Sequence, residues 1–272
     1  MSESVKQICV IGAGAAGLTA IKSCLEEGLE VVCYEKTSDI AGIWSFRSEP
    51  PEGVGRVQKT TITNSSNEIN GFSDFPYPKE YPNYMHHKKV YQYFQSYAQE
   101  FDLIRHILFE HSVLKVEKSD DYDSTHRLKV TVRDQKEDTF DTVFDGVMVC
   151  TGHHTRPRMP FFPGKESFKG KIFHSKDMTS LLDFQEYEDK TAVVVGIGNS
   201  GCDSAVELRF EEIPFKLKYK SMIFIAIYAI KLIWRYGRVV GFSRESVPTE
   251  CHSITNSTQD LVIKLETVYP FL

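Results

Sequence analysis

The first 35 residues alternate between short apolar runs and one amphipathic stretch. QICVI at residues 7–11 and EVVCYE at residues 30–35 are dominated by apolar and β-branched side chains, which predicts two buried strands. Between them, LTAIKSCLEEG at residues 18–28 carries its apolar positions on one helical face, and Gly28 is placed to end that helix. A strand, a Gly-rich turn, a helix and a second strand in this order predict a βαβ unit.

The middle of the chain changes its pattern twice. Residues 47–85 are rich in Pro, Gly, Asn and Tyr, which predicts a long ordered loop of the kind that often carries function. Residues 88–101 then repeat large apolar side chains at helical spacing, so we expect a helix there. We interpret its aromatic stripe as core packing rather than as a binding surface. The stripe consists of Val90, Tyr93, Phe94, Tyr97 and Phe101.

Residues 107–150 alternate between apolar and polar positions, as expected of an antiparallel meander. Its segments are 107–118, 126–134 and 138–150, and the polar DDYDST sequence separates the first two as a turn. The last strand, Gly146–Cys150, is apolar on both faces, which predicts a central position in a sheet.

The strand, Gly turn and helix pattern then occurs a second time. KTAVVV at residues 190–195 predicts another buried strand, GIGNSG follows it, and CDSAVEL at residues 202–208 predicts a helix. From about residue 209 the pattern no longer continues a βαβ unit, and Met222–Ile227 fits the next strand poorly. The pattern predicts an α/β fold with two dinucleotide-binding units of the Rossmann type and a β-meander between them.

Composition narrows the class of protein. The chain has 272 residues, 41% apolar and 25% charged, with a net charge of -5, as is ordinary for a globular protein. Basic residues are interspersed with acidic ones, so nothing in the composition indicates a nucleic-acid surface. The N-terminus lacks the features of a signal peptide, and the apolar run Met222–Ile230 is too short to span a bilayer.

Neither cysteines nor histidines indicate a metal site. The six cysteines include no C-x-x-C pair, and Cys9, Cys33 and Cys150 lie in apolar runs, which predicts buried free thiols in a reducing compartment. The pairs His86–His87 and His153–His154 are interpreted as surface or loop residues, because adjacent side chains on a turn seldom converge on one ion.

The first glycine loop fits G-x-G-x-x-G between a strand and a helix. Gly12 is expected to make a tight turn, Gly14 to let a pyrophosphate approach the backbone, and Gly17 to let helix and strand pack closely. Glu35 ends the next strand, where a carboxylate accepts hydrogen bonds from ribose hydroxyls and repels a 2′-phosphate. This loop is therefore predicted to bind FAD or NAD through the glycines, Glu35 and the intervening Ala13, Ala15 and Ala16.

The second glycine loop also follows a strand and opens a helix. Two dinucleotide sites in one chain favour a flavin on the first and a nicotinamide nucleotide on the second, with hydride transfer between them. The alternative is that the second loop binds nothing. The predicted residues of this site are Gly196, Gly198, Asn199, Ser200, Gly201 and Asp203.

Between the two loops, FKGKIFHSKDM contains Phe168, Gly170 and His174 in the spacing F-x-G-x-x-x-H, with Met178 where an aromatic residue is expected. In this motif the chain resembles the flavin-containing monooxygenase family. By that resemblance, Ile43–Trp44 belong to a turn that touches the flavin. The resemblance also places Asn64 and Ser65 in the active-site loop, with the Asn64 amide as the catalytic group beside the flavin ring.

The resemblance implies FAD and NADP(H) as cofactors. It implies a monooxygenase that transfers oxygen from O2, through a flavin C4a-hydroperoxide, to nucleophilic nitrogen or sulfur in small molecules. It also implies the cytoplasmic side of the endoplasmic reticulum, with peripheral membrane association, or the cytosol because this chain shows no anchor. No metal or nucleic acid is expected, and oligomeric state is not predicted.

The resemblance extends to about residue 208, whereas members of the family are longer. Residues 1–158 are therefore expected to form an FAD-binding domain that lacks a returning C-terminal segment. Residues 159–208 are expected to be a linker motif and the start of an incomplete NADP-binding domain, and residues 209–272 a divergent tail. A basic pair for the 2′-phosphate of NADPH has only Lys218, Lys220 and Arg235 as candidates.

Other functions remain open. The chain is alternatively a truncated FAD-binding remnant without catalysis, or an oxygenase of the Baeyer–Villiger type that shares the two glycine loops. The missing C-x-x-C pair disfavours a disulfide reductase. An NAD-binding structural protein has little support beyond Glu35.

Overall fold

The computed structural model describes residues 5–153, 155–178, 192–196, 198–210 and 261–264. The chain forms two compact units, residues 1–156 and residues 157–272. Several residues discussed above lie outside the described ranges: Cys251, Lys218, Lys220, Arg235, His154 and the run Met222–Ile230.

The first unit contains strands of a parallel sheet, a meander and four helices among its described residues. Its helices are α1 (Ala15–Glu26), α2 (Asn67–Asn70), α3 (His87–Glu100) and α4 (Tyr122–Thr125). Its strands are β1 (Gln7–Ile11), β2 (Glu30–Glu35), β3 (Ile107–Phe109), β4 (Ser112–Lys118), β5 (Leu128–Arg133), β6 (Thr139–Phe144) and β7 (Gly146–Val149).

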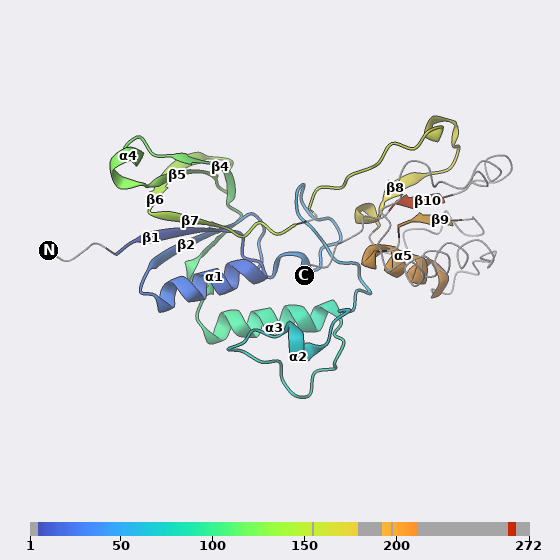
Figure 1. Ribbon diagram of the computed structural model, residues 1–272, viewed down its shortest axis with the longest axis horizontal. Coiled ribbons are helices and arrows are strands. Elements are labelled where there is room, and N and C mark those ends of the chain that lie inside the picture. Colours follow the sequence, from blue (N-terminus) through green and yellow to red (C-terminus); the bar gives the residue numbers. More distant parts are fainter. Residues whose placement is uncertain (1–4, 154, 179–191, 197, 211–260, 265–272) are drawn as a thin grey trace, which may run out of the picture. The chain divides into compact units, whose positions relative to one another are not determined.

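The first unit is layered around its parallel sheet, whose strand order is β3-β2-β1-β7. Helix α1 lies on one side of this sheet and the antiparallel meander β4-β5-β6 on the other (Figure 1). Successive side chains of β1 point to opposite faces of the sheet. Val10 packs into the core with the helices, and its neighbour Cys9 packs with Val130 of the meander. The fully apolar run of β1 follows from this two-sided burial.

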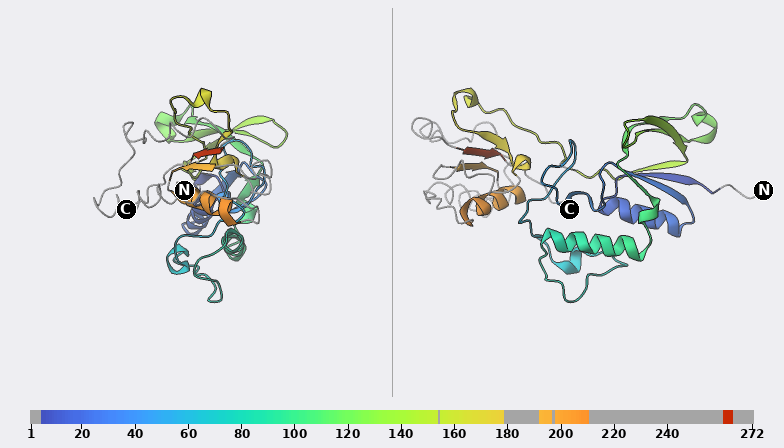
Figure 2. Two further views of the ribbon diagram at one scale, coloured as in Figure 1. Left: turned by 90° about the vertical axis from the view of Figure 1, so that its right-hand side faces the viewer. Right: turned by 180° about the vertical axis from the view of Figure 1, so that it is seen from behind.

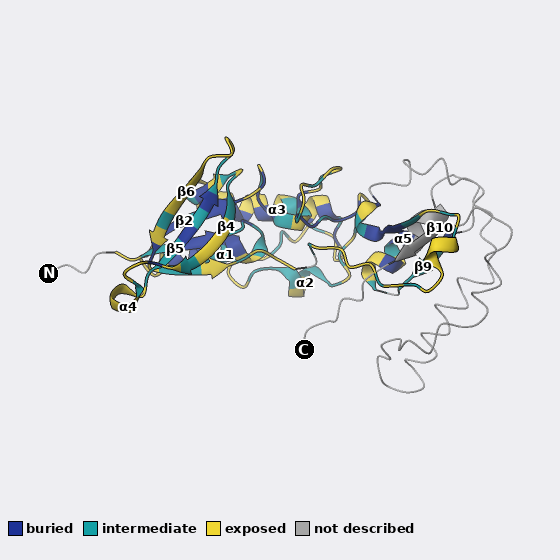
Figure 3. Ribbon diagram, turned by 90° about the horizontal axis from the view of Figure 1, so that it is seen from above, coloured by how far each residue is buried: buried dark blue, intermediate teal, exposed yellow. Residues whose placement is uncertain are grey.

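The aromatic stripe on α3 is core, as predicted. Buried positions recur along α3 (Figure 3), among them Val90, Tyr93 and Tyr97. The rings of Phe72 and Phe75 from the preceding loop pack against the two tyrosines. Helix and loop thus share one aromatic cluster, and burial of such rings contributes strongly to stability.

Two of the three cysteines in apolar runs are fully buried. Burial raises the pKa of the Cys9 thiol to about 12, so this thiol stays protonated at neutral pH. Cys33 is buried likewise, whereas Cys150 is only partly buried.

The predicted meander is wrong at both of its ends. Residues 107–118 form two strands, because the chain turns at Glu110 (φ 58°), so that β3 pairs in parallel with β2 and only β4 enters the meander. The strand expected to be central, β7, pairs with β1 and is the last strand of its sheet within the described residues. Its Val147 packs with the meander and its Met148 sulfur lies 3.8 Å from that of Cys24 on α1, whereas Val149 is exposed.

The remaining elements of the first unit lie close to their predicted positions. Helix α1 begins three residues before the predicted start, and Gly28 (φ 73°) follows its end. The polar turn at residues 120–125 contains the short helix α4. Helix α3 is shifted by one residue from the predicted range.

The second unit has a small parallel sheet of its own. Its elements are β8 (Ile172–His174), β9 (Ala192–Val195), α5 (Asn199–Phe210) and β10 (Leu261–Lys264). The strand order is β8-β10-β9, and all pairs are parallel (Figure 2). Strand β10 therefore comes from the segment expected to be a divergent tail and forms a βαβ unit with β9 and α5.

Candidate functional site

Two glycines of the first loop have no room for a side chain. Gly12 has a φ of 98°, and a Cβ there would lie 2.7 Å from the carbonyl oxygen of Cys150. A Cβ on Gly17 would lie 1.8 Å from the carbonyl oxygen of Gly12, so the start of α1 passes directly over the end of β1. Both contacts match the roles expected from the sequence.

Gly14 is different, because a Cβ there would make only ordinary van der Waals contacts. The protein atom nearest to a Cβ there is the Gly42 Cα, at 3.8 Å. No side chain caps α1, and its first turn contains no acidic residue. The N–H groups of residues 15–17 therefore point out of the first turn of the helix toward a position where a phosphate is favoured. The residues present fit a dinucleotide pyrophosphate.

Glu35 is buried (6% exposed) and is bound to the glycine loop. Its Oε2 accepts a hydrogen bond from the Ala13 N–H at 2.7 Å. Its Oε1 accepts two from Thr37, from the N–H at 2.8 Å and from the hydroxyl at 2.7 Å. A carboxylate has about four acceptor sites, so these bonds leave capacity for one ribose hydroxyl. The role of Glu35 in reading the ribose remains a prediction that this geometry permits.

A turn at residues 41–44 closes over the first glycine loop. The Ala41 N–H donates to the Ala13 carbonyl at 2.9 Å, and a 3-10 helix starts at Gly42. A Cβ on Gly42 would lie 3.4 Å from the Gly14 Cα. Of the pair Ile43–Trp44, the isoleucine is exposed and the tryptophan packs partly against the core. The structure thus brings this pair next to the glycine loop.

A polar network behind this turn was not foreseen from the sequence. Asp39 accepts hydrogen bonds from the Tyr91 hydroxyl at 2.6 Å and the Ser45 hydroxyl at 2.8 Å. Arg47 donates to the carbonyl oxygens of Gly42 and Ser45 and to the Thr37 hydroxyl. Polar residues near the turn are the only sequence signal for this network, because its partners meet through tertiary packing.

Asn64 lies in a bend that follows an isolated antiparallel bridge. Ile62 forms this bridge with His86, and the Thr63 N–H donates to the Met85 carbonyl at 2.8 Å. Met85 is fully buried, while Asn64 is exposed. Its predicted partner Ser65 is engaged within its own loop, where it bonds Asn70 at 2.8 Å.

His87 is not the surface residue expected from the sequence. It is 2% exposed, at the start of α3, and the Nε2 atoms of His86 and His87 lie 3.0 and 3.1 Å from the Lys59 carbonyl oxygen. Burial lowers the pKa of His87, and the neighbouring His86 adds to this effect. The described residues contain no cluster of three metal-ligating side chains.

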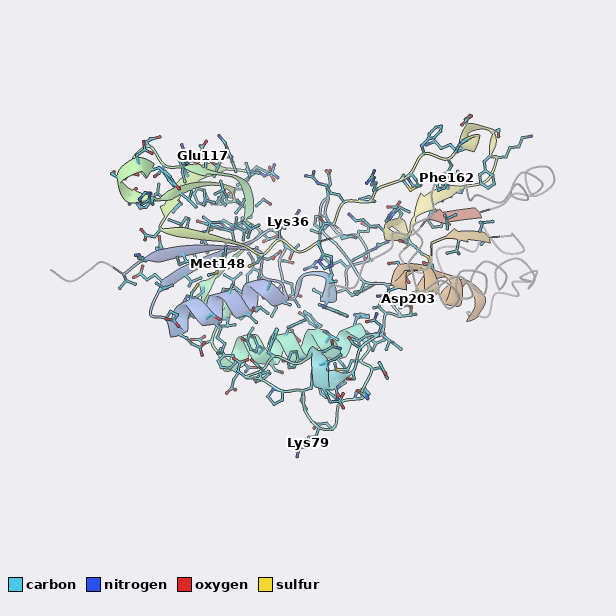
Figure 4. The ribbon with its side chains drawn as sticks, viewed as in Figure 1. Lys36, Lys79, Glu117, Met148, Phe162 and Asp203 are labelled. Atoms are coloured by element: carbon cyan, nitrogen blue, oxygen red, sulfur yellow. The ribbon has the colours of Figure 1, made fainter. Side chains whose placement is uncertain are left out.

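The second glycine loop has the same order of elements. Gly196 has a φ of 123°, and the Gly198 carbonyl accepts from the Gly201 N–H at 2.8 Å as α5 begins. Asn199 and Ser200 are exposed at the start of the helix, within reach of a ligand. Asp203 projects from α5 (Figure 4), and burial raises the pKa of its carboxyl.

The histidine of the F-x-G-x-x-x-H motif has a structural role in its own turn. His174 ends β8, and its Nδ1 accepts from the Lys176 N–H at 3.0 Å to cap the following 3-10 helix. Asp177 completes the cap by accepting from the His174 N–H. Met178, which stands in place of the expected aromatic residue, is fully buried.

Comparison with known proteins gives a family. A family model described as flavin-binding monooxygenase-like matches residues 5–214. Flavin-containing monooxygenase 5 of Mus musculus is 49% identical over 205 residues, which cover 75% of this chain and 38% of the relative. Flavin-containing monooxygenase 3 of Macaca mulatta is 41% identical over 255 residues, covering 90% of this chain and 46% of the relative.

The fold has solved counterparts. The structure of S-allyl-L-cysteine S-oxygenase from Allium sativum superposes with a TM-score of 0.72 at 20% identity, over 100% of this chain and 64% of the other. At that identity the likeness concerns the fold, and it confirms the Rossmann-like α/β architecture. The chain spans less than half of the curated relatives it matches.

Proposed function

Because the chain belongs to the family of flavin-binding monooxygenases, we propose that its first unit binds FAD and its second unit binds NADPH. The reaction is the transfer of one oxygen atom from O2 to a soft nucleophilic nitrogen or sulfur of a small molecule. Since the chain covers 38% of a relative's length, this proposal concerns the part that these residues play in such an enzyme.

The observation that carries the proposal is the uncapped start of α1 at the first glycine loop. Gly12 and Gly17 have no room for a side chain, and no side chain caps α1, so the N–H groups of its first turn are left for a ligand. A pyrophosphate there gains the N–H groups of the first helical turn. Glu35 would hold the ribose, and the turn at residues 41–44 would border the flavin.

Asn64 is proposed as the residue that touches the reacting atoms. Its exposed side-chain amide both donates and accepts hydrogen bonds, so it can bind polar atoms beside a flavin held by the first unit. A bound flavin, once reduced, supplies the activation of O2. The protein then has to exclude water and orient the substrate.

Fewer observations support nucleotide binding at the second glycine loop than at the first. The exposed Asn199 and Ser200 stand where the phosphates of a nicotinamide nucleotide would bind, at the start of α5. A second candidate function therefore remains, namely a flavin-binding chain in which the second loop binds nothing.

An anaerobic titration tests these alternatives. The 272-residue chain is loaded with FAD, and the flavin absorbance is recorded as NADPH is added. Bleaching of the bound flavin is expected if both sites work. A chain that binds FAD and ignores NADPH retains only the first site, and a chain that does not bind FAD contradicts the proposal.

Substrate class is tested in the same preparation once oxygen is admitted. We expect a sulfide to give its sulfoxide and a tertiary amine its N-oxide. Oxidation of a cyclic ketone to a lactone, with sulfide and amine unchanged, would instead favour the Baeyer–Villiger type.

We further propose that the protein works on the cytoplasmic face of the endoplasmic reticulum, as the resemblance implies. No helix within the described ranges is both long and apolar enough to cross a bilayer. Fractionation of cells tests the location. Recovery in the microsomal pellet supports it, and recovery in the cytosolic supernatant contradicts it.

A further inference from the structure

Arg47 contacts two parts of the first site at once. Its Nη1 donates to the carbonyl oxygens of Gly42 at 3.2 Å and Ser45 at 3.0 Å, which belong to the turn that closes over the glycine loop. Its Nη2 donates to the Thr37 hydroxyl oxygen at 2.9 Å. A guanidinium offers five N–H donors in a fixed plane, so one side chain can hold all three oxygens.

Thr37 transmits this contact to Glu35. Because the Thr37 oxygen accepts from Arg47, its own proton points elsewhere, and the nearest acceptor is the Glu35 Oε1 at 2.7 Å. The carbonyl of Asp39, at 3.0 Å, is the second choice. Arg47 therefore favours the direction in which the Thr37 hydroxyl holds Glu35.

The two oxygens of Glu35 are used unequally as a result. Thr37 supplies two donors to Oε1, whereas Oε2 has the Ala13 N–H as its donor among the described residues. An acceptor site therefore remains at Oε2, on the oxygen that is already bound to the glycine loop. A ribose hydroxyl of a dinucleotide bound over that loop could donate a hydrogen bond to this Oε2 atom.

We propose that Arg47 is a positioning residue for the adenosine half of the cofactor. Through Thr37 it fixes Glu35 so that Oε2 receives a ribose hydroxyl, and through Gly42 and Ser45 it fixes the neighbouring turn. This inference rests on the proposed function, because it needs a dinucleotide in the first site. A lysine at this position would keep the charge but could not hold three oxygens in one plane.

The test measures how strongly the protein recognises the ribose hydroxyls, with binding as the readout. Dissociation constants of ADP and 2′,3′-dideoxy-ADP are determined by calorimetry for the full 272-residue chain and its variants. In the wild type we expect the dideoxy compound to bind about tenfold more weakly, as for the loss of one hydrogen bond to a charged group. In Arg47→Met the ratio should fall to about twofold, because Glu35 is no longer fixed.

Two further variants separate this role from a general effect. Arg105→Met removes the same charge from an exposed ion pair with Asp102, and it should keep the wild-type ratio. Arg47→Lys should give a ratio between those of the wild type and Arg47→Met. A purely structural role for Arg47 would weaken both ligands equally and leave the ratio at its wild-type value, which would overturn the proposal.

A pair of substitutions at Thr37 decides the matter even if Arg47→Met does not fold. Thr37→Ser keeps the hydroxyl and should keep the ratio, whereas Thr37→Val removes it and should lower the ratio. Equal ratios in the two variants contradict the relay. If the wild type binds neither ADP nor FAD, the proposed function of the first site fails together with this inference. If an Arg47 variant still binds ADP and keeps the wild-type ratio of the two dissociation constants, only the role of Arg47 is overturned.

Discussion

At Gly17 the backbone of α1 touches the end of β1 so closely that a methyl group has no space. Gly17→Ala is expected to lower the free energy of unfolding by about 3 kcal/mol, because the backbone must shift to relieve the overlap with the Gly12 carbonyl. Gly28→Ala is the matched control. Gly28 has a φ of 73° and open space around it, so we expect a loss of about 1 kcal/mol from the backbone alone. Equal losses in urea unfolding would contradict the close-packing argument.

His87 makes stability depend on pH. Its pKa is lowered in the folded protein by burial, so the unfolded chain binds the proton more tightly. Stability is therefore fully present above the ordinary value of 6.5 and falls as the pH drops toward the lowered pKa of the folded state.

The slope attributable to one proton is at most about 1.4 kcal/mol per pH unit. We expect His87→Gln to flatten the dependence of the unfolding free energy between pH 7 and pH 5, as measured in urea. An identical slope in both proteins would show that His87 does not titrate on unfolding.

At the scale of elements, Tyr93 joins α3 to the loop before it. Its hydroxyl accepts from the Phe72 N–H and donates to the Phe75 carbonyl. Tyr93→Phe leaves both backbone groups without this partner and should cost about 1–3 kcal/mol of unfolding free energy. The half-buried Tyr122 serves as a control, because Tyr122→Phe should change stability much less. A similar loss in both variants would refute the special role of Tyr93.

The elements predicted from the sequence are those determined by residues close together in the chain. Short-range periodicity and glycines at the ends of elements predicted the helices α1 and α3 and the strands β1, β2 and β9. They did not predict the division between β3 and β4, because β3 is selected by pairing with β2 far away in the chain. Strand β10 was missed for the same reason, since four apolar-rich residues become a strand only beside β8 and β9.

The same distinction holds for the candidate site. The two glycine loops were predicted because the geometry of a turn and the start of a helix depend on residues that are adjacent in the sequence. The bonds that hold Glu35 through Thr37 and Arg47 were not, because the partners come together only in the folded unit. The burial of His87 was missed similarly, since it depends on tertiary contacts such as that with the Phe46 ring.

At the scale of the whole molecule, we expect β7 to promote self-association. Val149 is 70% exposed and Met148 39%, and within the described residues the strand pairs with β1 alone. Exposed apolar edge strands pair with other chains. We therefore expect a concentration-dependent increase in apparent size, as measured by light scattering.

Val149→Lys should reduce this self-association, because a charge on an edge strand opposes pairing. The control is Ile69→Lys, which places a charge at an equally exposed apolar position on α2, away from both sheets of the first unit. If both variants reduce association alike, general hydrophobicity is responsible and the β7 edge is not.

The two βαβ units also differ in the order in which they can form during synthesis. In the first unit, Gln7 pairs with Glu30, whereas in the second Ala192 pairs with Leu261. Closing a connection about three times longer costs only about 1 kcal/mol more entropy, so its effect is on rate more than on final stability. A growing chain completes β1, α1 and β2 early, while β9 waits on the ribosome until β10 has been made. A pause or a stop in translation before residue 261 would therefore leave a complete first glycine loop and an unfinished second sheet.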